Sequence, residues 1–194
     1  MLEKIKELDT SLLVYLNSLG SETYDKFWLI ITQQLYWTPF FLFLFYIIYK
    51  KIGIKQTLYV VLFIAVLVAF TDQITNLVKN NFQRLRPCNN PEINTIIRVV
   101  QSRKSYSFFS GHAANTMAVS TFLYLILKRH FKYLGFLFLW PLIFAYSRIY
   151  LGLHYPGDIL TGYLVGAILG SLLYLVYRKL KPKYFPENNF IILS

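Results

Sequence analysis

Apolar segments separated by short basic links set the hydrophobic pattern of this chain. Four of them, at about 58–78, 111–127, 133–150 and 158–177, approach or reach the ~20 helical residues that cross a bilayer. A fifth apolar stretch covers 27–49 and is interrupted by three polar residues after Ile31. The pattern leaves open whether this stretch is one kinked span or an interfacial helix followed by a short span.

The start of the chain predicts a short amphipathic helix at Asp9–Leu19. Asp9 or one of the next two residues could cap it, and Gly20 could end it. The helix is too short to span a membrane, so we expect residues 1–26 to form an interfacial segment. The first nine residues lack the compact apolar core of a signal peptide, and we therefore expect the spans themselves to direct insertion.

Composition supports a membrane protein. Of the 194 residues, 56% are apolar and only 15% are charged, a balance that is rare in soluble domains. We therefore predict an all-α, polytopic membrane bundle of about five or six transmembrane helices plus the interfacial helix, forming one domain over 1–194. Cys88 is the single cysteine, which excludes an internal disulfide. The three histidines lie 18 and 24 residues apart, so we expect no metal and no cofactor.

The net charge of +11 is explained in large part by membrane topology rather than by nucleic acid. Basic residues cluster in the links after the first, third and fifth spans and in the tail at 178–194. They are Lys50, Lys51, Lys55, Lys128, Arg129, Lys132, Arg178, Lys179, Lys181 and Lys183. By the positive-inside rule these links and the tail are cytoplasmic, in the inner membrane of a bacterium if the chain is bacterial.

The remaining loops then lie on the outer, periplasmic face: a long loop at 79–111 and a turn at 146–158. They carry basic residues that topology does not require, namely Lys79, Arg84, Arg86, Arg98, Arg103, Lys104 and Arg148. A polyanionic ligand would explain these charges. Contact with lipid headgroups, or a solvated loop, is the alternative.

The turn carries the strongest chemistry. Arg148, His154 and Asp158 lie within eleven residues, and Pro156-Gly157 breaks the regular backbone between the last two. The four-residue spacing lets the carboxylate hold one ring nitrogen of His154 and leave the other free to act. Asp158 could also cap the last span. We interpret this turn as the catalytic turn of a phosphate-handling membrane enzyme.

A second cluster joins Lys79 to Arg86. The two are seven residues apart, about two helical turns, so we expect both on one face of a helix that Pro87 stops. Arginine offers a planar fork for phosphate oxygens and lysine a point charge. Basic residues also flank many spans without any such role.

A third cluster is Ser110-Gly111-His112, at the start of a predicted span. A helix start has unpaired N–H groups and a positive dipole end, which suit an oxyanion. Ser110 could cap this helix and donate to phosphate, and His112 would lie in its first turn. The alternative is an ordinary helix entry with a surface histidine.

Taken in order, Lys-x6-Arg-Pro, Ser-Gly-His and Ser-Arg-x5-His-x3-Asp resemble the signature of the type-2 phosphatidic acid phosphatase family. The motifs cover 79–158. The vanadium haloperoxidases share this site pattern, but they are not expected to be built from membrane spans. One departure is Phe109, where the family usually has proline; it removes no reactive group.

The resemblance implies a role for each motif residue. His154 would be the nucleophile that forms a phosphohistidine, and Asp158 would orient and polarise it. His112 would protonate the leaving oxygen and then help to activate water. The phosphoryl oxygens would be bound by Lys79, Arg86, Ser110, Arg148 and the backbone of Gly111. The implied chemistry needs no metal.

Asp72 is a carboxylate near the end of a span, where a charge is costly unless it is paired. It shares a helical face with Asn76 and Lys79. We hypothesise that Asp72 pairs with a basic residue of the site and positions it. The alternative is a polar face packed against neighbouring spans.

The sequence therefore predicts a membrane lipid phosphatase acting on a lipid phosphate or diphosphate. Undecaprenyl diphosphate, phosphatidylglycerophosphate, phosphatidic acid and the 1-phosphate of lipid A remain open as substrates. A lipid phosphotransferase with the same site and a non-catalytic phospholipid transporter are the alternatives. The expected partners are the lipid substrate and membrane lipids, without nucleic acid, and the oligomeric state is left open.

Overall fold

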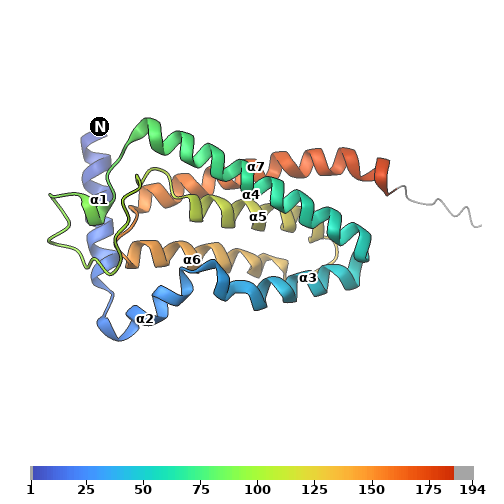
Figure 1. Cartoon of the computed structure of the whole chain (residues 1–194), viewed down its shortest axis with the longest axis horizontal. Coiled ribbons are helices and arrows are strands. Elements are labelled where there is room, and N and C mark those ends of the chain that lie inside the picture. The colour runs from blue at the N-terminus through green and yellow to red at the C-terminus, as the bar shows by residue number, and fades with distance from the viewer. Residues whose placement is uncertain (1, 186–194) are drawn as a thin grey trace, which may run out of the picture.

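The structure, a computed structural model, describes residues 2–185 and is all-α over that range. Its helices are α1 (Leu2–Ser18), α2 (Glu22–Ile31), η1 (Gln34–Trp37), α3 (Thr38–Ile52), α4 (Ile54–Phe82), η2 (Pro87–Asn89), α5 (Gly111–Leu127), η3 (Leu134–Phe138), α6 (Leu139–Tyr150) and α7 (Pro156–Tyr184). Figure 1 shows α3 to α7 running side by side as a bundle, with α1 crossing one end.

Helix α5 is the centre of this bundle and packs on α7, α4 and α6. Small residues allow its backbone to approach α7 closely. A Cβ atom added at Gly166 would lie 2.3 Å from the carbonyl oxygen of Ala114, and one at Gly170 would lie 2.4 Å from that of Ala118. This tight seam fixes the start of α5 against the start of α7, where the predicted site residues lie.

The predicted alternation of spans is present in the bundle. Figure 1 places the α3–α4 junction, the α5–α6 connection and the end of α7 at one end. The long loop after α4 and the helix α1 lie at the other end. The three basic links are therefore grouped on one side, away from the long loop, as the charge pattern predicts.

The polytopic helical class is confirmed, and the helices of the bundle differ in length. Over the described residues, two are long and apolar enough to cross a membrane, α4 with the residues that follow it and α7. Helix α2 and the η1–α3 segment would make a third, bent by 70° at the predicted polar break. The segment Leu134–Tyr150 is a shorter apolar helix, and α5 has 17 residues. By length and composition alone, two to three of the described helices therefore qualify as spans, and the remaining apolar helices of the bundle are shorter.

The prediction for the N-terminal helix was right in kind and wrong in its start. Helix α1 begins at Leu2 because the residues before Asp9 are good helix formers, chiefly leucine, lysine and glutamate. Asp9 therefore lies in mid-helix and is no cap. Together with Leu13 and Asn17, at four-residue spacing, it forms the face that packs on the bundle. Exposed Leu8 and Tyr15 lie off that face.

The last helix is longer than predicted. It continues to Tyr184 instead of ending near residue 177, so the first part of the predicted tail at 178–194 is helical. Pro182 lies in its final turn. The remainder of that tail, 186–194, lies outside the described residues.

Candidate active site

The predicted catalytic turn lies between α6 and α7. Helix α6 ends at Tyr150, and Gly152 turns the chain with a φ of 75°. Pro156 then opens α7, and the carboxylate of Asp158 accepts a hydrogen bond from the N–H of Tyr155 at 3.1 Å. The predicted cap is therefore present, and it turns the carboxylate back towards the residues that precede the helix.

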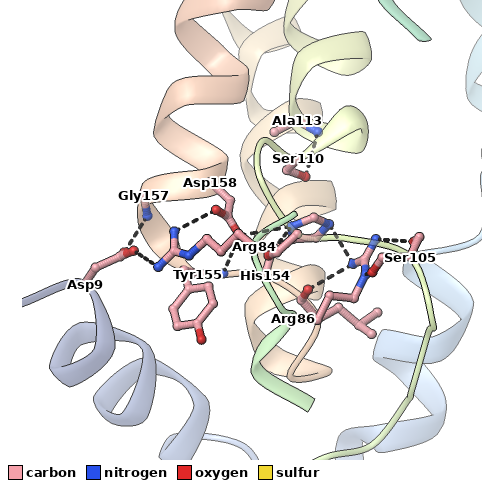
Figure 2. Close-up of polar contacts among 12 residues, drawn as sticks. Asp9, Arg84, Arg86, Ser105, Ser110, Ala113, His154, Tyr155, Gly157 and Asp158 are labelled. Atoms are coloured by element: carbon pink, nitrogen blue, oxygen red, sulfur yellow. Dashed lines mark hydrogen bonds and ion pairs between the residues drawn. The ribbon is translucent and has the colours of Figure 1, made fainter. Parts of the chain in front are cut away.

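His154 and Asp158 form the predicted pair. Nδ1 of His154 lies 3.3 Å from Oδ2 of Asp158, and the two side chains are 1% and 0% exposed (Figure 2). The hydroxyl of Ser107 donates to the same carboxylate oxygen and lies 3.4 Å from Nδ1. The carboxylate thus holds one ring nitrogen of the histidine, as the spacing predicts.

The other ring nitrogen faces Arg86. Nη1 of Arg86 lies 2.9 Å from Nε2 of His154 and also donates to the carbonyl of Leu153 at 2.9 Å. The rest of the guanidinium donates to the carbonyl and hydroxyl of Ser105 at 2.7 and 3.0 Å. Because a guanidinium can only donate, Nε2 must accept and the ring proton belongs on Nδ1, facing Asp158.

The predicted shared helical face of Lys79 and Arg86 is wrong. Helix α4 ends at Phe82 because Gln83 takes a left-handed conformation, with a φ of 48°. Arg86 therefore lies in the loop, from which it reaches His154. Lys79 remains in the last turn of α4, half-buried and within electrostatic range of Arg86 and Asp158.

The start of α5 meets the same turn. Ser110 caps the helix by accepting from the N–H of Ala113 at 3.4 Å, and its own N–H donates to the carbonyl of Asp158 at 3.0 Å. Gly111 packs against Thr75 of α4, where a Cβ atom would lie 3.1 Å from the threonine methyl. The Ser-Gly-His motif is therefore tied directly to α7.

His112 stacks on Phe144, with ring centroids 5.4 Å apart and planes 20° apart. It lies within electrostatic range of both His154 and Arg148. The two imidazoles predicted to act together therefore lie at the same end of the bundle.

Arg148, in the last turn of α6, is 1% exposed and donates from Nη1 to the hydroxyl of Thr32. Its Nε and Nη2 have no hydrogen-bond partner among residues 2–185. Buried donors on a cation are costly when unpaired, which favours an anion as their partner.

The charge balance keeps His154 neutral. Burial lowers its pKa well below the usual 6.5, and the cations Arg86, Arg148, Lys79 and Arg84 lower it further. The imidazole is therefore unprotonated at neutral pH and offers a lone pair at Nε2. Over residues 2–185, no three histidine, cysteine or acidic side chains lie together as a metal ion would require.

The hypothesis for Asp72 is wrong. Its carboxylate accepts from the amide of Asn115 at 2.6 Å, and within the described chain it pairs with no basic residue. Lys79, the nearest basic residue along α4, lies seven residues further, a rise of about 10 Å.

Sequence reasoning gave no catalytic role to two residues that contact the pair, Arg84 and Ser107. Arg84 donates to both Asp158 and Asp9, 74 and 75 residues away, and Ser107 contacts both His154 and Asp158. Arg84 was visible as an excess charge, but nothing in the sequence joined it to Asp9.

An apolar cavity of about 450 Å³ lies between α3, α4, α5 and α6. Phe144, which stacks on His112, forms part of its wall, so the cavity adjoins the site. Its other lining residues include Phe41, Val61, Val119 and Trp140, and Asn115 adds a polar group.

Residues 56–182 match the family model described as the PAP2 superfamily. Two relatives are lipid A 4′-phosphatases, from Bacteroides thetaiotaomicron at 35% identity and from Porphyromonas gingivalis at 31%. These alignments cover 93% and 91% of this chain, and 81% and 75% of the relatives.

Two solved structures share the fold. A transmembrane PAP2-type phosphatidylglycerolphosphate phosphatase from Bacillus subtilis has a TM-score of 0.66 at 22% identity, covering 92% of this chain and 88% of its own. LpxE from Aquifex aeolicus has a TM-score of 0.61 at 22% identity, covering 86% and 94%.

Proposed function

The chain belongs to the PAP2 superfamily and is a membrane lipid phosphatase, and we propose that it removes the 4′-phosphate of lipid A through a phosphohistidine at His154. The observation that carries the mechanism is the placement of the proton and the lone pair on the imidazole of His154. Its Nδ1 proton faces Asp158, and its Nε2 lone pair faces the guanidinium of Arg86. A neutral nucleophile surrounded by cations suits a phosphoryl group.

In the first step, Nε2 of His154 attacks phosphorus and the bond from phosphorus to the lipid oxygen breaks. His112 donates a proton to that oxygen, so the lipid leaves as an alcohol. Lys79, Arg86 and Arg148 stabilise the charge that spreads over the three equatorial oxygens, with help from the start of α5 at Ser110 and Gly111. Arg86 moves its donor from Nε2 to a phosphoryl oxygen as the substrate enters.

In the second step, water attacks the phosphohistidine, and the bond between phosphorus and Nε2 breaks to release inorganic phosphate. His112, now unprotonated, accepts a proton from that water. Asp158 holds the Nδ1 proton throughout and so stabilises the positive charge that the imidazole gains in the intermediate. The cycle returns both histidines to their starting states.

The choice among lipid phosphates rests on the relatives. The sequence left four substrates open, one of them the 1-phosphate of lipid A. The two relatives above 30% identity are lipid A 4′-phosphatases, which favours lipid A and its 4′ position. The apolar cavity beside His112 supports a lipid leaving group, because an acyl chain there would lie next to the proton donor.

We further propose that the site faces the periplasm. The basic links gather at the opposite end of the bundle from α1 and the long loop (Figure 1), and by the positive-inside rule the former end is cytoplasmic. The site then meets its substrate in the outer leaflet of the inner membrane.

The test is a phosphate-release panel with purified protein. The panel contains lipid A, undecaprenyl diphosphate, phosphatidylglycerophosphate and phosphatidic acid, with the His154→Ala protein as the blank. We expect lipid A to be hydrolysed with the highest kcat/KM, and mass spectrometry of the product to show loss of the 4′-phosphate. Similar rates on all four lipids, or loss of the 1-phosphate, would contradict the substrate assignment.

A further inference from the structure

Arg84 bridges two carboxylates that lie on different helices. Its Nη1 donates to Oδ1 of Asp158 and its Nη2 donates to Oδ2 of Asp9, both at 2.8 Å (Figure 2). Its guanidinium also lies 3.7 Å from the centre of the Tyr155 ring. The side chain is therefore held on three sides, by α1, by α7 and by the residue that follows His154.

The two oxygens of Asp158 have different partners. Oδ2 receives the N–H of Tyr155, the hydroxyl of Ser107 and the ring of His154. Oδ1 receives only Arg84 among the described residues. Because Asp158 is fully buried, Arg84 is the cation that compensates its charge and fixes the rotation of the carboxylate.

Asp9 in turn fixes Arg84. Its Oδ1 accepts from the N–H of Gly157 at 2.7 Å, which is one of the unpaired donors at the start of α7. The absence of a side chain at Gly157 allows this approach, since a Cβ atom there would lie 2.9 Å from Oδ2 of Asp9. Asp9 therefore binds the cation and the helix start with its two oxygens.

Helix α1 has further anchors that support this contact. Leu13 is fully buried against the turn region, and the amide of Asn17 donates to the carbonyls of Ile149 and Tyr150. Asp9 thus lies at a fixed place over the catalytic turn. It also lies outside residues 56–182, which match the family model.

We infer that Arg84 and Asp9 form a positioning pair, through which the N-terminal helix α1 holds Asp158 in register with the nucleophile His154. This inference rests on the proposed function, in which the two residues of the dyad act together. Neither Arg84 nor Asp9 needs to touch the substrate. The burial of Arg84 lowers its pKa, but Asp158 and Asp9 more than offset this and raise the pKa above its usual value, so the bridge stays charged.

The first test measures kcat and KM of Arg84→Gln, Arg84→Lys and Asp9→Asn on the lipid that the panel selects. Loss of a positioning partner typically costs about 10–100-fold in activity, so we expect kcat to fall in that range with KM little changed. Arg84→Lys should recover part of the loss, because lysine can reach one carboxylate but not both. Glu7→Gln is the matched control, since it removes an exposed carboxylate from the same helix.

The second test is a double-mutant cycle. If Asp9 acts through Arg84, the Asp9→Asn/Arg84→Gln protein should be no slower than Arg84→Gln alone. If the losses in kcat of the two single variants instead multiply in the double variant, the inference is overturned. A merely structural role for α1 would lower the thermal stability of Asp9→Asn and leave its kcat per folded molecule unchanged, which would also overturn it.

The third test needs no substrate and so separates this inference from the proposed function. The imidazole of His154 has Asp158 on Nδ1 and Arg86 on Nε2, and the side chains within electrostatic range of it are Arg84, Arg148, Lys79 and His112. In histidine-labelled protein followed by NMR, with the His154→Ala protein to assign the signal, removal of the Arg84 cation should raise the pKa of His154.

Loss of the Asp9 charge alone would lower the pKa of His154, whereas displacement of Arg84 from Asp158 would raise it. If Asp9 positions Arg84, Asp9→Asn should therefore raise this pKa, as Arg84→Gln does, and Glu7→Gln should leave the resonance in place. A resonance that neither variant moves would overturn the inference even if the protein hydrolyses lipid A. The expected shifts in a protein without lipid A hydrolysis would overturn the substrate assignment and retain the positioning pair.

Discussion

Nη1 of Arg86 lies 2.9 Å from Nε2 of His154, so a cation of the proposed phosphate site is hydrogen-bonded to the proposed nucleophile. The contact has two consequences. It fixes the tautomer, because Arg86 can only donate and the ring proton must then lie on Nδ1 beside Asp158. It also holds the lone pair in the direction from which a phosphoryl group bound by Arg86 would arrive.

The first prediction concerns the pH dependence of Arg86→Gln. The pKa of His154 is lowered first by burial and next by Arg86, so the neutral nucleophile persists below pH 6.5 and is lost as the pH falls through that lowered pKa. Without the cation, the pKa rises, and the acid limb of kcat/KM against pH should move to higher pH. The activity above that limb should also fall by about 10²–10³-fold, as for other lost transition-state donors. An acid limb that stays in place would show that Arg86 does not set the charge of His154.

The second prediction concerns His154→Ala. Removal of the nucleophile should lower turnover by about 10⁴-fold or more while the lipid still binds. Wild-type protein quenched during turnover should carry an acid-labile phosphate that the variant lacks. His130→Ala is the control, because His130 is exposed in the α5–α6 connection, at the other end of the bundle. Hydrolysis retained by His154→Ala would refute the nucleophile assignment.

The third prediction concerns the apolar cavity beside His112. Val61 lines it from α4, and a tryptophan there would occupy space that the proposal gives to an acyl chain. Each methylene that can no longer be buried costs about 0.8 kcal/mol, so loss of two should raise KM for the long-chain lipid about tenfold. A short-chain phosphate ester should be hydrolysed as before. Val66→Trp is the control, because Val66 is exposed on the same helix but does not line the cavity.

The hydrophobic pattern predicted the bounds of helices with a continuous apolar run. It failed where a single residue determines where a helix begins or ends. Helix α5 has the bounds expected from its apolar run, Gly111–Leu127. Helix α4 ends earlier than Pro87 suggested, because Gln83 adopts a left-handed conformation that no residue preference announces. The start of α1 was missed for a different reason: its first turns are helix-forming but carry charges that hide an apolar face.

Within the site, the sequence predicted only contacts between residues of one motif, whose spacing fixes their geometry. His154 and Asp158 are four residues apart, so their contact follows from local geometry. The contact between Asp9 and Gly157 spans 148 residues and depends on where α1 crosses the end of the bundle. The pairing predicted for Asp72 fails for a similar reason, since its partner on α5 is decided by how α4 packs.

The last prediction concerns the seam between α5 and α7, on which the whole site depends. At Gly166 a Cβ atom would lie 2.3 Å from the carbonyl oxygen of Ala114 and 3.0 Å from the N–H nitrogen of Ala118, and neither backbone atom can move unless the helices separate. Alanine is a better helix former than glycine by about 1 kcal/mol, so a loss of stability in Gly166→Ala can come only from this contact. We expect a loss of about 1–3 kcal/mol and a melting temperature lower by roughly 2–10 °C in the same detergent. Activity should fall as well, because separation stretches the hydrogen bond from the N–H of Ser110 to the carbonyl of Asp158.

Gly135→Ala is the control, since no atom lies within 4 Å of its added Cβ. Equal melting temperatures for the two variants would show that α5 and α7 can move apart without cost, and the convergence of the three motifs would then need another cause.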